Sequence, residues 1–111
     1  MKLLVCVLQE MEKLEQLLNK LEYAGIKGAT VLQSKGIAVT LLDSKKDIPF
    51  LGNLRSVLDP EREENCTIFI VLNEEKVDIA IKTIEETIGD INAPNTGIIF
   101  TAPVDFAKGI R

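Results

Sequence analysis

Two short stretches of almost continuous apolar residues, each followed by a stretch of helical periodicity, constrain the fold more than any other feature. Residues 2–8 (KLLVCVL) and 66–72 (CTIFIVL) have the length and composition of buried strands. After the first, apolar residues recur at helical spacing up to a stop at Gly25, namely Met11, Leu14, Leu17, Leu18 and Leu21. After the second, Asn73 is a good N-cap for a helix with the apolar face Val77, Ala80, Ile81, Ile84 and Ile88. The chain therefore predicts two strand–helix units.

A further strand-forming segment follows each helix. We expect a strand over Gly28–Leu42, a long one with a weak point at Gly36, and a fourth strand over Gly97–Ala102, before a short tail from Pro103. The order β-α-β, loop, β-α-β is the split βαβ arrangement of the α+β ferredoxin-like fold. It places two helices on one face of a four-stranded antiparallel sheet, with the first and third strands in the centre. A length of 111 residues suits one domain over 1–111.

The two central strands are apolar at nearly every position instead of alternating with polar residues. This pattern indicates that both faces of the sheet are buried, although the helices cover only one. The remaining loop could shield only part of the other face. The sequence therefore predicts a homo-oligomer.

The segment 43–65 is the longest irregular stretch and is rich in charge around an apolar centre. Long connections in small domains are usually functional loops or disordered segments, and Pro49 with the spacing from Phe50 favours a short helix here. The residues that we expect to contact a partner protein are Ile48, Phe50, Leu51, Leu54 and Arg55. The alternative that this segment only caps an exposed sheet face stays open.

Composition excludes several classes of function. The chain has no histidine, which removes His-based nucleophile systems and most zinc sites, and we expect no metal site. A net charge of −4 disfavours a nucleic-acid partner. No apolar run is long enough for a membrane span, and no leader peptide is evident. Cys6 and Cys66 lie in apolar runs without metal or redox spacing, so we interpret them as core residues of a cytoplasmic protein.

Two stretches resemble the PII family of nitrogen regulatory signalling proteins. Residues 25–36 (GIKGATVLQSKG) resemble that family's G-I-x-G-x-T-V-x-E-x-K/R-G segment, and residues 97–105 (GIIFTAPVD) look like its G-K-I-F-V-x-P-V-E segment. The segment 43–65 falls where the family has its protruding T-loop, and residues 91–96 fall where it has its B-loop. The resemblance covers nearly the whole chain.

The resemblance implies a trimer that binds ATP or ADP between subunits, often with 2-oxoglutarate, and that docks on a target protein through the T-loop. Carried over by motif, Thr30, Lys35 and Gly36 would lie at the base of that loop against a nucleotide. The phosphate side would be lined by Asn95, Thr96 and Gly97, and Arg111 matches the second of two phosphate-binding arginines.

Departures from the family pattern fall on the expected phosphate contacts. Ile98 stands at the family's lysine and Gly109 at its first arginine, and the chain ends at Arg111, before the family's T-G-E. Pro94 removes one N–H donor from the loop. We therefore expect a divergent PII-like member with no certain cofactor, whose effector is ATP, ADP or another adenylyl compound. Each of these residues also has a structural alternative to ligand binding. Thr30 would then be only a β-forming residue, Gly36 and Gly97 turn glycines, and Arg111 a solvated chain end.

The prediction from these observations is a non-enzymatic regulator of nitrogen or energy metabolism, with a small effector, an unidentified target protein and no catalytic residues. One alternative is a PII-fold scaffold that has lost nucleotide binding. Another is an acylphosphatase-like hydrolase on the same fold, although Gln9-Glu10-Met11-Glu12 is acidic where a phosphate should bind. RNA-recognition modules and metal-tolerance proteins share the fold. This chain lacks the basic strand residues that the first class needs and the metal ligands that the second class needs.

Overall fold

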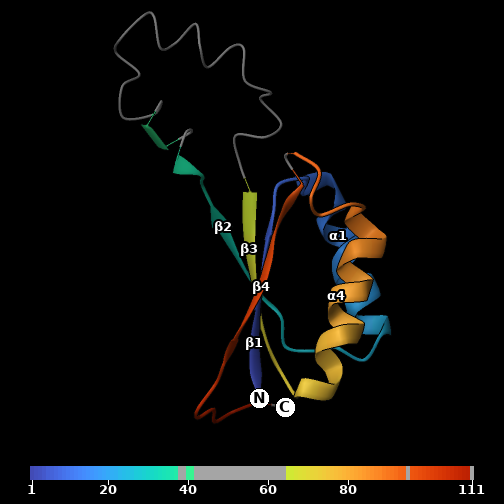
Figure 1. Cartoon of the computed structure of the whole chain (residues 1–111), viewed down its shortest axis with the longest axis vertical. Coiled ribbons are helices and arrows are strands. Elements are labelled where there is room, and N and C mark those ends of the chain that lie inside the picture. The colour runs from blue at the N-terminus through green and yellow to red at the C-terminus, as the bar shows by residue number, and fades with distance from the viewer. Residues whose placement is uncertain (38–39, 42–64, 95, 111) are drawn as a thin grey trace, which may run out of the picture.

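Residues 1–37, 40–41, 65–94 and 96–110 are described by a computed structural model of the chain (Figure 1). In chain order its elements are the strand β1 (Lys2–Leu8), the 3-10 helix η1 (Met11–Lys13), the helix α1 (Leu14–Tyr23), the strands β2 (Thr30–Ser34) and β3 (Asn65–Leu72), the helix α4 (Glu74–Ile88) and the strand β4 (Gly97–Pro103).

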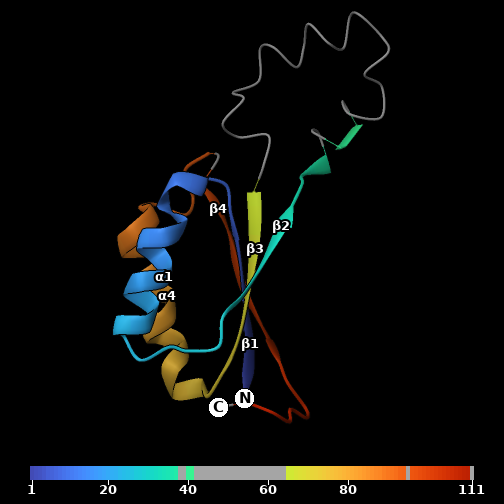
Figure 2. The same ribbon diagram turned by 180° about the vertical axis from the view of Figure 1, so that it is seen from behind.

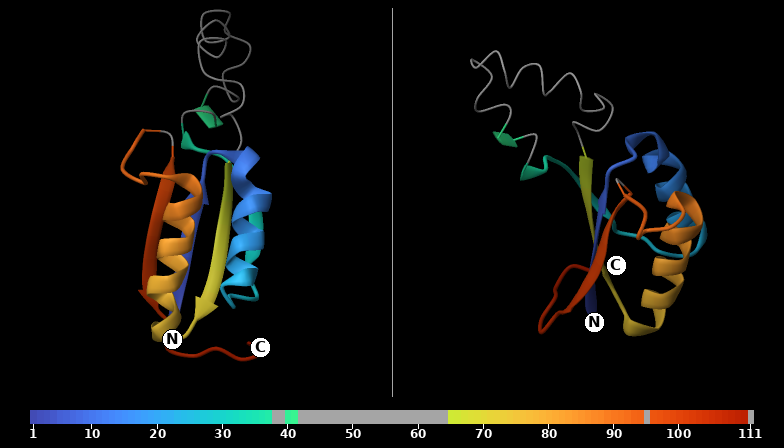
Figure 3. Two further views of the ribbon diagram at one scale, coloured as in Figure 1. Left: turned by 90° about the vertical axis from the view of Figure 1, so that its right-hand side faces the viewer. Right: turned by 45° about the horizontal axis from the view of Figure 1, so that its top comes forward.

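The strands form one antiparallel sheet in the order β2-β3-β1-β4. β1 and β3 occupy the centre, and β2 and β4 form opposite edges. In the register across the centre, Lys2 lies opposite Leu72 and Leu8 opposite Cys66. Both α1 and α4 lie on the same side of the sheet (Figure 1, Figure 3). The predicted α+β ferredoxin-like fold is confirmed, including its central strands and the face that the helices cover.

The core lies between the sheet and the two helices, because alternate residues of the central strands point to the helix side. On this side, six residues of the central strands are at most 1% exposed, namely Leu4, Cys6, Leu8, Cys66, Ile68 and Ile70. They pack against the apolar stripes of the helices, to which Leu17, Leu21, Ala80, Ile84 and Ile88 belong. The helical spacing in the sequence therefore identified the buried face of each helix.

The two cysteines are free thiols buried in this core. Burial, and to a smaller extent the neighbouring Cys66 thiol, raises the pKa of Cys6 to about 12. Burial also raises the pKa of Cys66, although a hydrogen bond with the backbone of Leu8 works in the opposite direction. Both thiols are therefore protonated near neutral pH, and the interpretation of these residues as small apolar core residues is confirmed.

The side of the sheet away from the helices carries an apolar surface, which we call the open face. The register and the alternation of side chains assign to it Leu3, Val5 and Val7 of β1, Leu32 of β2, Thr67, Phe69 and Val71 of β3, and Ile98, Phe100 and Ala102 of β4. No helix among the described residues covers it (Figure 2). Its edge residues are the most accessible, since Leu32, Ile98 and Phe100 are 51%, 57% and 51% exposed.

The expectation of a long strand over Gly28–Leu42 is wrong beyond Ser34. β2 pairs with β3 from Thr30 opposite Phe69 to Ser34 opposite Asn65, where β3 begins. The chain then turns, and Ile37 is helical. The amide of Thr40 donates to the carbonyl oxygen of Gly36 at 3.0 Å, which is the i to i−4 bond of a helical turn.

The other predicted boundaries differ by a residue or two. The first helix opens with η1, the third strand begins at Asn65 instead of Cys66, and the fourth strand includes Pro103. Asn73 is the N-cap of α4, as predicted, but makes no side-chain capping bond. Residues 43–64 of the predicted insert, including all five expected partner contacts, lie outside the described residues. Within the described ranges, no helix has the length and apolar character needed to cross a membrane.

Candidate functional site

A cavity of about 590 Å³ lies beside Thr30, at the start of the edge strand β2. Phe69 and Val71 of β3 form its wall on the open face. The segment before β2 and the C-terminal tail after β4 complete the lining, with Lys27, Gly28, Gly109 and Ile110. This volume falls within the range of about 300–1,000 Å³ typical of small-molecule pockets. Thr30 is thus brought together with Gly109 and Ile110 of the C-terminal tail. The predicted Arg111 lies outside the described residues.

Lys35 and Gly36 lie at the other end of β2 from this cavity. Lys35 is five positions after Thr30 along the chain, which corresponds to roughly 17 Å of extended strand. The end of β2 is fixed to β3 by side-chain hydrogen bonds: Ser34 Oγ donates to Asn65 Oδ1, and Ser34 Oγ lies 2.9 Å from Thr67 Oγ1. Sequence reasoning missed this polar trio because Asn65 was assigned to the charged insert.

Thr96 and Gly97 lie at the start of the opposite edge strand, β4. Thr96 is buried, with 3% of its surface exposed, and its carbonyl oxygen accepts a hydrogen bond from the amide of Gln9 at 3.3 Å. Gly97 has φ 151°, and a Cβ at this position would lie 2.2 Å from the carbonyl oxygen of Val7. The backbone conformation and the close approach of Val7 therefore explain why glycine is needed at position 97. Asn95 lies outside the described residues.

One copy of the chain does not bring all the predicted ligand residues together. β2 and β4 are separated by the two central strands, so residues on them lie roughly 14 Å apart across three strand spacings. Thr30 and Lys35-Gly36 lie on one edge, and Thr96-Gly97 lies on the other. A single site containing both sets needs the β2 edge of one copy beside the β4 edge of another.

The two departures from the expected phosphate contacts also have places in the structure. Ile98 lies on the open face, and Gly109 lines the cavity beside Thr30. Among the described residues that line this cavity, Lys27 is the only cation and there is no carboxylate. The cavity is therefore mainly apolar, with one positive charge at its rim.

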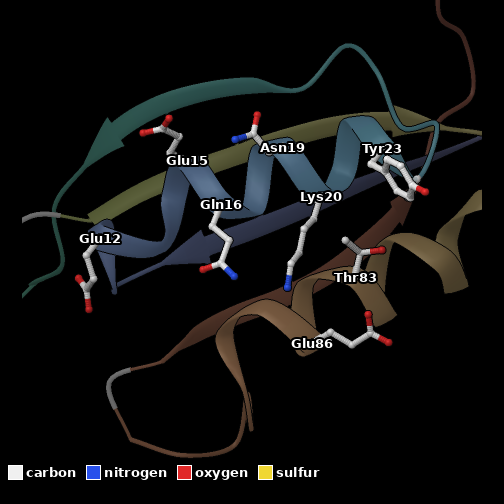
Figure 4. Close-up of a pocket in the computed structure, with 9 residues that line it drawn as sticks. Glu12, Glu15, Gln16, Asn19, Lys20, Tyr23, Thr83 and Glu86 are labelled. Atoms are coloured by element: carbon white, nitrogen blue, oxygen red, sulfur yellow. The ribbon is translucent and has the colours of Figure 1, made fainter.

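A concavity of about 870 Å³ is a groove between α1 and α4 on the outer side of the molecule (Figure 4). Its lining includes Glu12, Glu15 and Glu86, with Lys20 between the helices and Tyr23 at one end. Tyr23 is the last residue of α1 and is 96% exposed. These residues lie on the outward sides of the two helices, where they line a broad groove.

The loop after β1 is the place where a hydrolase on this fold would need an anion cradle. Glu10 Oε2 instead accepts from Lys13 Nζ at 2.8 Å, so the nearest cation is already paired with a carboxylate. The described residues also contain no group of three or more cysteine or carboxylate side chains arranged to hold a metal ion.

Comparison with known proteins gives one clear match. The sequence model of the family described as "Nitrogen regulatory protein P-II" matches residues 1–111, which is the whole chain. No curated protein matches it.

Proposed function

The chain belongs to the nitrogen regulatory protein P-II family, and from this membership we propose that it is a regulatory protein that binds a small adenylyl effector between its copies. Members of the family are regulators of nitrogen metabolism, are typically trimeric and bind effectors. The proposal for this chain concerns the effector, its location and the target that responds to it.

The observation that carries the proposal is the division of the candidate residues between the two edges of the sheet. The cavity beside Thr30 supplies apolar walls from Phe69 and Val71, which suit a planar ring. Thr96 and Gly97 lie on the opposite edge, where they could complete the pocket of a neighbouring copy. An effector bound at this position would be held by two copies at once, and its binding would be coupled to their assembly.

The open face supports the same assembly. Its aliphatic and aromatic side chains on all four strands would be covered by equivalent faces of other copies, as the sequence pattern predicted. We propose a homotrimer on this basis and on the usual assembly of the family. The segment 43–65, with Ile48, Phe50, Leu51, Leu54 and Arg55, is proposed to contact the target protein.

A regulator fits the described residues better than the hydrolase alternative. The ion pair between Glu10 and Lys13 puts a carboxylate in the loop where an acyl phosphate would have to bind. The scaffold alternative, in which nucleotide binding has been lost, rests on the uncharged Ile98 and Gly109. Thermal unfolding with adenylyl compounds separates the scaffold alternative from the proposed effector site.

The first test is thermal unfolding of the assembled protein with ATP, ADP, AMP, cyclic AMP or 2-oxoglutarate in the presence of magnesium. A ligand at 100 times its dissociation constant is expected to stabilise the fold by about 2.7 kcal/mol per site. Thr30→Trp, which fills the cavity, is expected to remove this shift. Val31→Trp is the matched control, because Val31 lies on the same strand and points to the other side of the sheet.

Loss of the shift in Thr30→Trp and its retention in Val31→Trp would support the effector site. If no adenylyl compound raises the unfolding temperature of the intact oligomer, the effector proposal is wrong and the scaffold alternative holds.

A further inference from the structure

The groove between α1 and α4, which we call the helix groove, belongs neither to the proposed effector site nor to the open face. It extends from Glu12 in η1 to Tyr23 at the end of α1 (Figure 4). Eleven positions at 1.5 Å each make it roughly 16 Å long, which is about three helical turns. Both helices lie on the side of the sheet away from the open face (Figure 1, Figure 2). An assembly built on the open face therefore leaves the helix groove accessible.

Carboxylates dominate the charge of the helix groove. Glu12, Glu15 and Glu86 line it, and Lys20, which lies between the two helices, is the only cation among the described residues of the lining (Figure 4). Three carboxylates against one ammonium group give the lining a net charge of −2. Within the described ranges none of the three glutamates makes an ion pair. Unpaired carboxylates along a concave surface create a negative potential that attracts cationic groups.

The rest of the lining is neutral and ends on an exposed aromatic ring. Ala24 and Thr83 are its half-buried members. Thr83 Oγ1 donates to the carbonyl oxygen of Ile79 at 2.7 Å, so this hydroxyl is satisfied within α4. Tyr23 is 96% exposed, which leaves nearly its whole ring available for contact. Tyrosine is among the residues that contribute most to protein interfaces, and its ring attracts lysine and arginine side chains.

We propose that the helix groove binds a cationic amphipathic helix of a partner protein. Two packed helices accept a third between their ridges, and about three turns of it match the length of the groove. Lysine or arginine side chains on one face of this helix would lie against Glu12, Glu15 and Glu86, and another would lie on the ring of Tyr23. Nucleic acids and anionic membranes carry the wrong charge for this surface.

This inference goes beyond the proposed function. It gives the protein a second interaction surface on the outside of the assembly, which is separate from the effector site and from the segment 43–65. Its occupant is recognised by charge and helical periodicity.

The chain carries its own reporter for this site, because Tyr23 is its only tyrosine and it has no tryptophan. The test is a titration of the assembled protein at low ionic strength, followed by tyrosine fluorescence. The probe is an alanine-rich helical peptide of about 18 residues with lysines on one face and no aromatic residue. A second peptide of the same composition has its lysines distributed around the helix. We expect the first peptide to change the tyrosine emission saturably and the second to bind more weakly.

Substitutions within and outside the groove locate the binding. Glu15→Gln and Glu86→Gln are each expected to weaken binding about threefold, within the range of an exposed ion pair. Glu22→Gln and Glu85→Gln are the matched controls, because they remove the same charge from exposed positions on the same two helices outside the groove. Neither is expected to change the affinity. Lys20→Gln is expected to strengthen binding, since it removes the cation from the lining.

Two results would overturn the proposal. Equal weakening by all four glutamine variants would show that the peptide responds to the net charge of the protein and not to the groove. Tyrosine emission that stays unchanged with the first peptide would show that the groove is not occupied. Unfolding temperatures of the variants without peptide show whether the fold is intact. Neither result bears on the effector site, which thermal unfolding with adenylyl compounds tests separately.

Discussion

Phe100→Glu is expected to convert the oligomer into separate chains. Phe100 lies on the open face in a row that runs across all four strands, with Val5, Phe69 and Thr30 as the successive cross-strand neighbours. It is 51% exposed in a single copy and would be covered in the assembly. A carboxylate buried there without a partner costs several kcal/mol per copy, which exceeds what one interface of a small oligomer can absorb.

Sedimentation equilibrium measures the result directly. The wild type is expected at three times the chain mass of 12.3 kDa and the variant at the mass of one chain. Ile79→Glu is the matched control, because Ile79 is 47% exposed but lies on α4, away from the open face. Its mass is expected to equal that of the wild type. A trimer that persists in Phe100→Glu would show that the open face is not the interface.

Gly97→Ala is expected to cause the largest loss of stability among Gly→Ala changes at the described glycines. The new Cβ would lie 2.2 Å from the carbonyl oxygen of Val7, in the backbone of the paired strand β1, which cannot move aside as a flexible side chain can. The φ of 151° adds backbone strain for any residue with a Cβ. Strain and forced strand displacement each cost about 1–3 kcal/mol, so we expect a loss of roughly 3 kcal/mol or more in the free energy of unfolding.

Gly89→Ala separates the two causes. Gly89 caps α4 with a φ of 83°, but nothing lies within 4 Å of the position of its Cβ. This variant is expected to lose only the strain component, about 1 kcal/mol. Chemical denaturation of both variants gives the comparison. Equal losses in Gly97→Ala and Gly89→Ala would mean that β1 and β4 relax around the added methyl group.

The expected instability of Gly97→Ala changes how the motif around Gly97 is interpreted. The resemblance places this residue on the phosphate side of a nucleotide, but the contact with Val7 gives it a structural requirement that holds without any ligand. A variant at Gly97 that loses ligand binding therefore reports damage to the fold before it reports a lost ligand contact. Thr30 is the better position for testing the site.

The fold could be predicted because its main determinants are local. The continuous apolar runs and the helical spacing identified the core residues of β1, β3, α1 and α4. The prediction of a strand over Gly28–Leu42 was wrong beyond Ser34, because a strand also depends on pairing with a segment far away in the chain. The pairing of β2 with β3 ends at Ser34 opposite Asn65, the first residue of β3. β-forming residues without a partner strand have no ladder to join, so Ile37 lies in a helical turn.

The candidate site was predicted only in part. The motif identified Thr30, but its companions Phe69 and Val71 depend on the register between β2 and β3. The position of Lys76 beside Gly25 depends on a close approach between the α1–β2 turn and the start of α4. Such contacts join segments far apart in the chain, and no spacing in the sequence encodes them.

The central claim is that the effector is bound by the edges of two neighbouring copies. Native mass spectrometry of the wild type and of Phe100→Glu, each with saturating ADP, tests it most directly. The account predicts a wild-type trimer that carries one ADP per chain, and a Phe100→Glu monomer that carries none. A monomer that binds ADP as well as the trimer does would contradict it, because the site would then be complete within one chain.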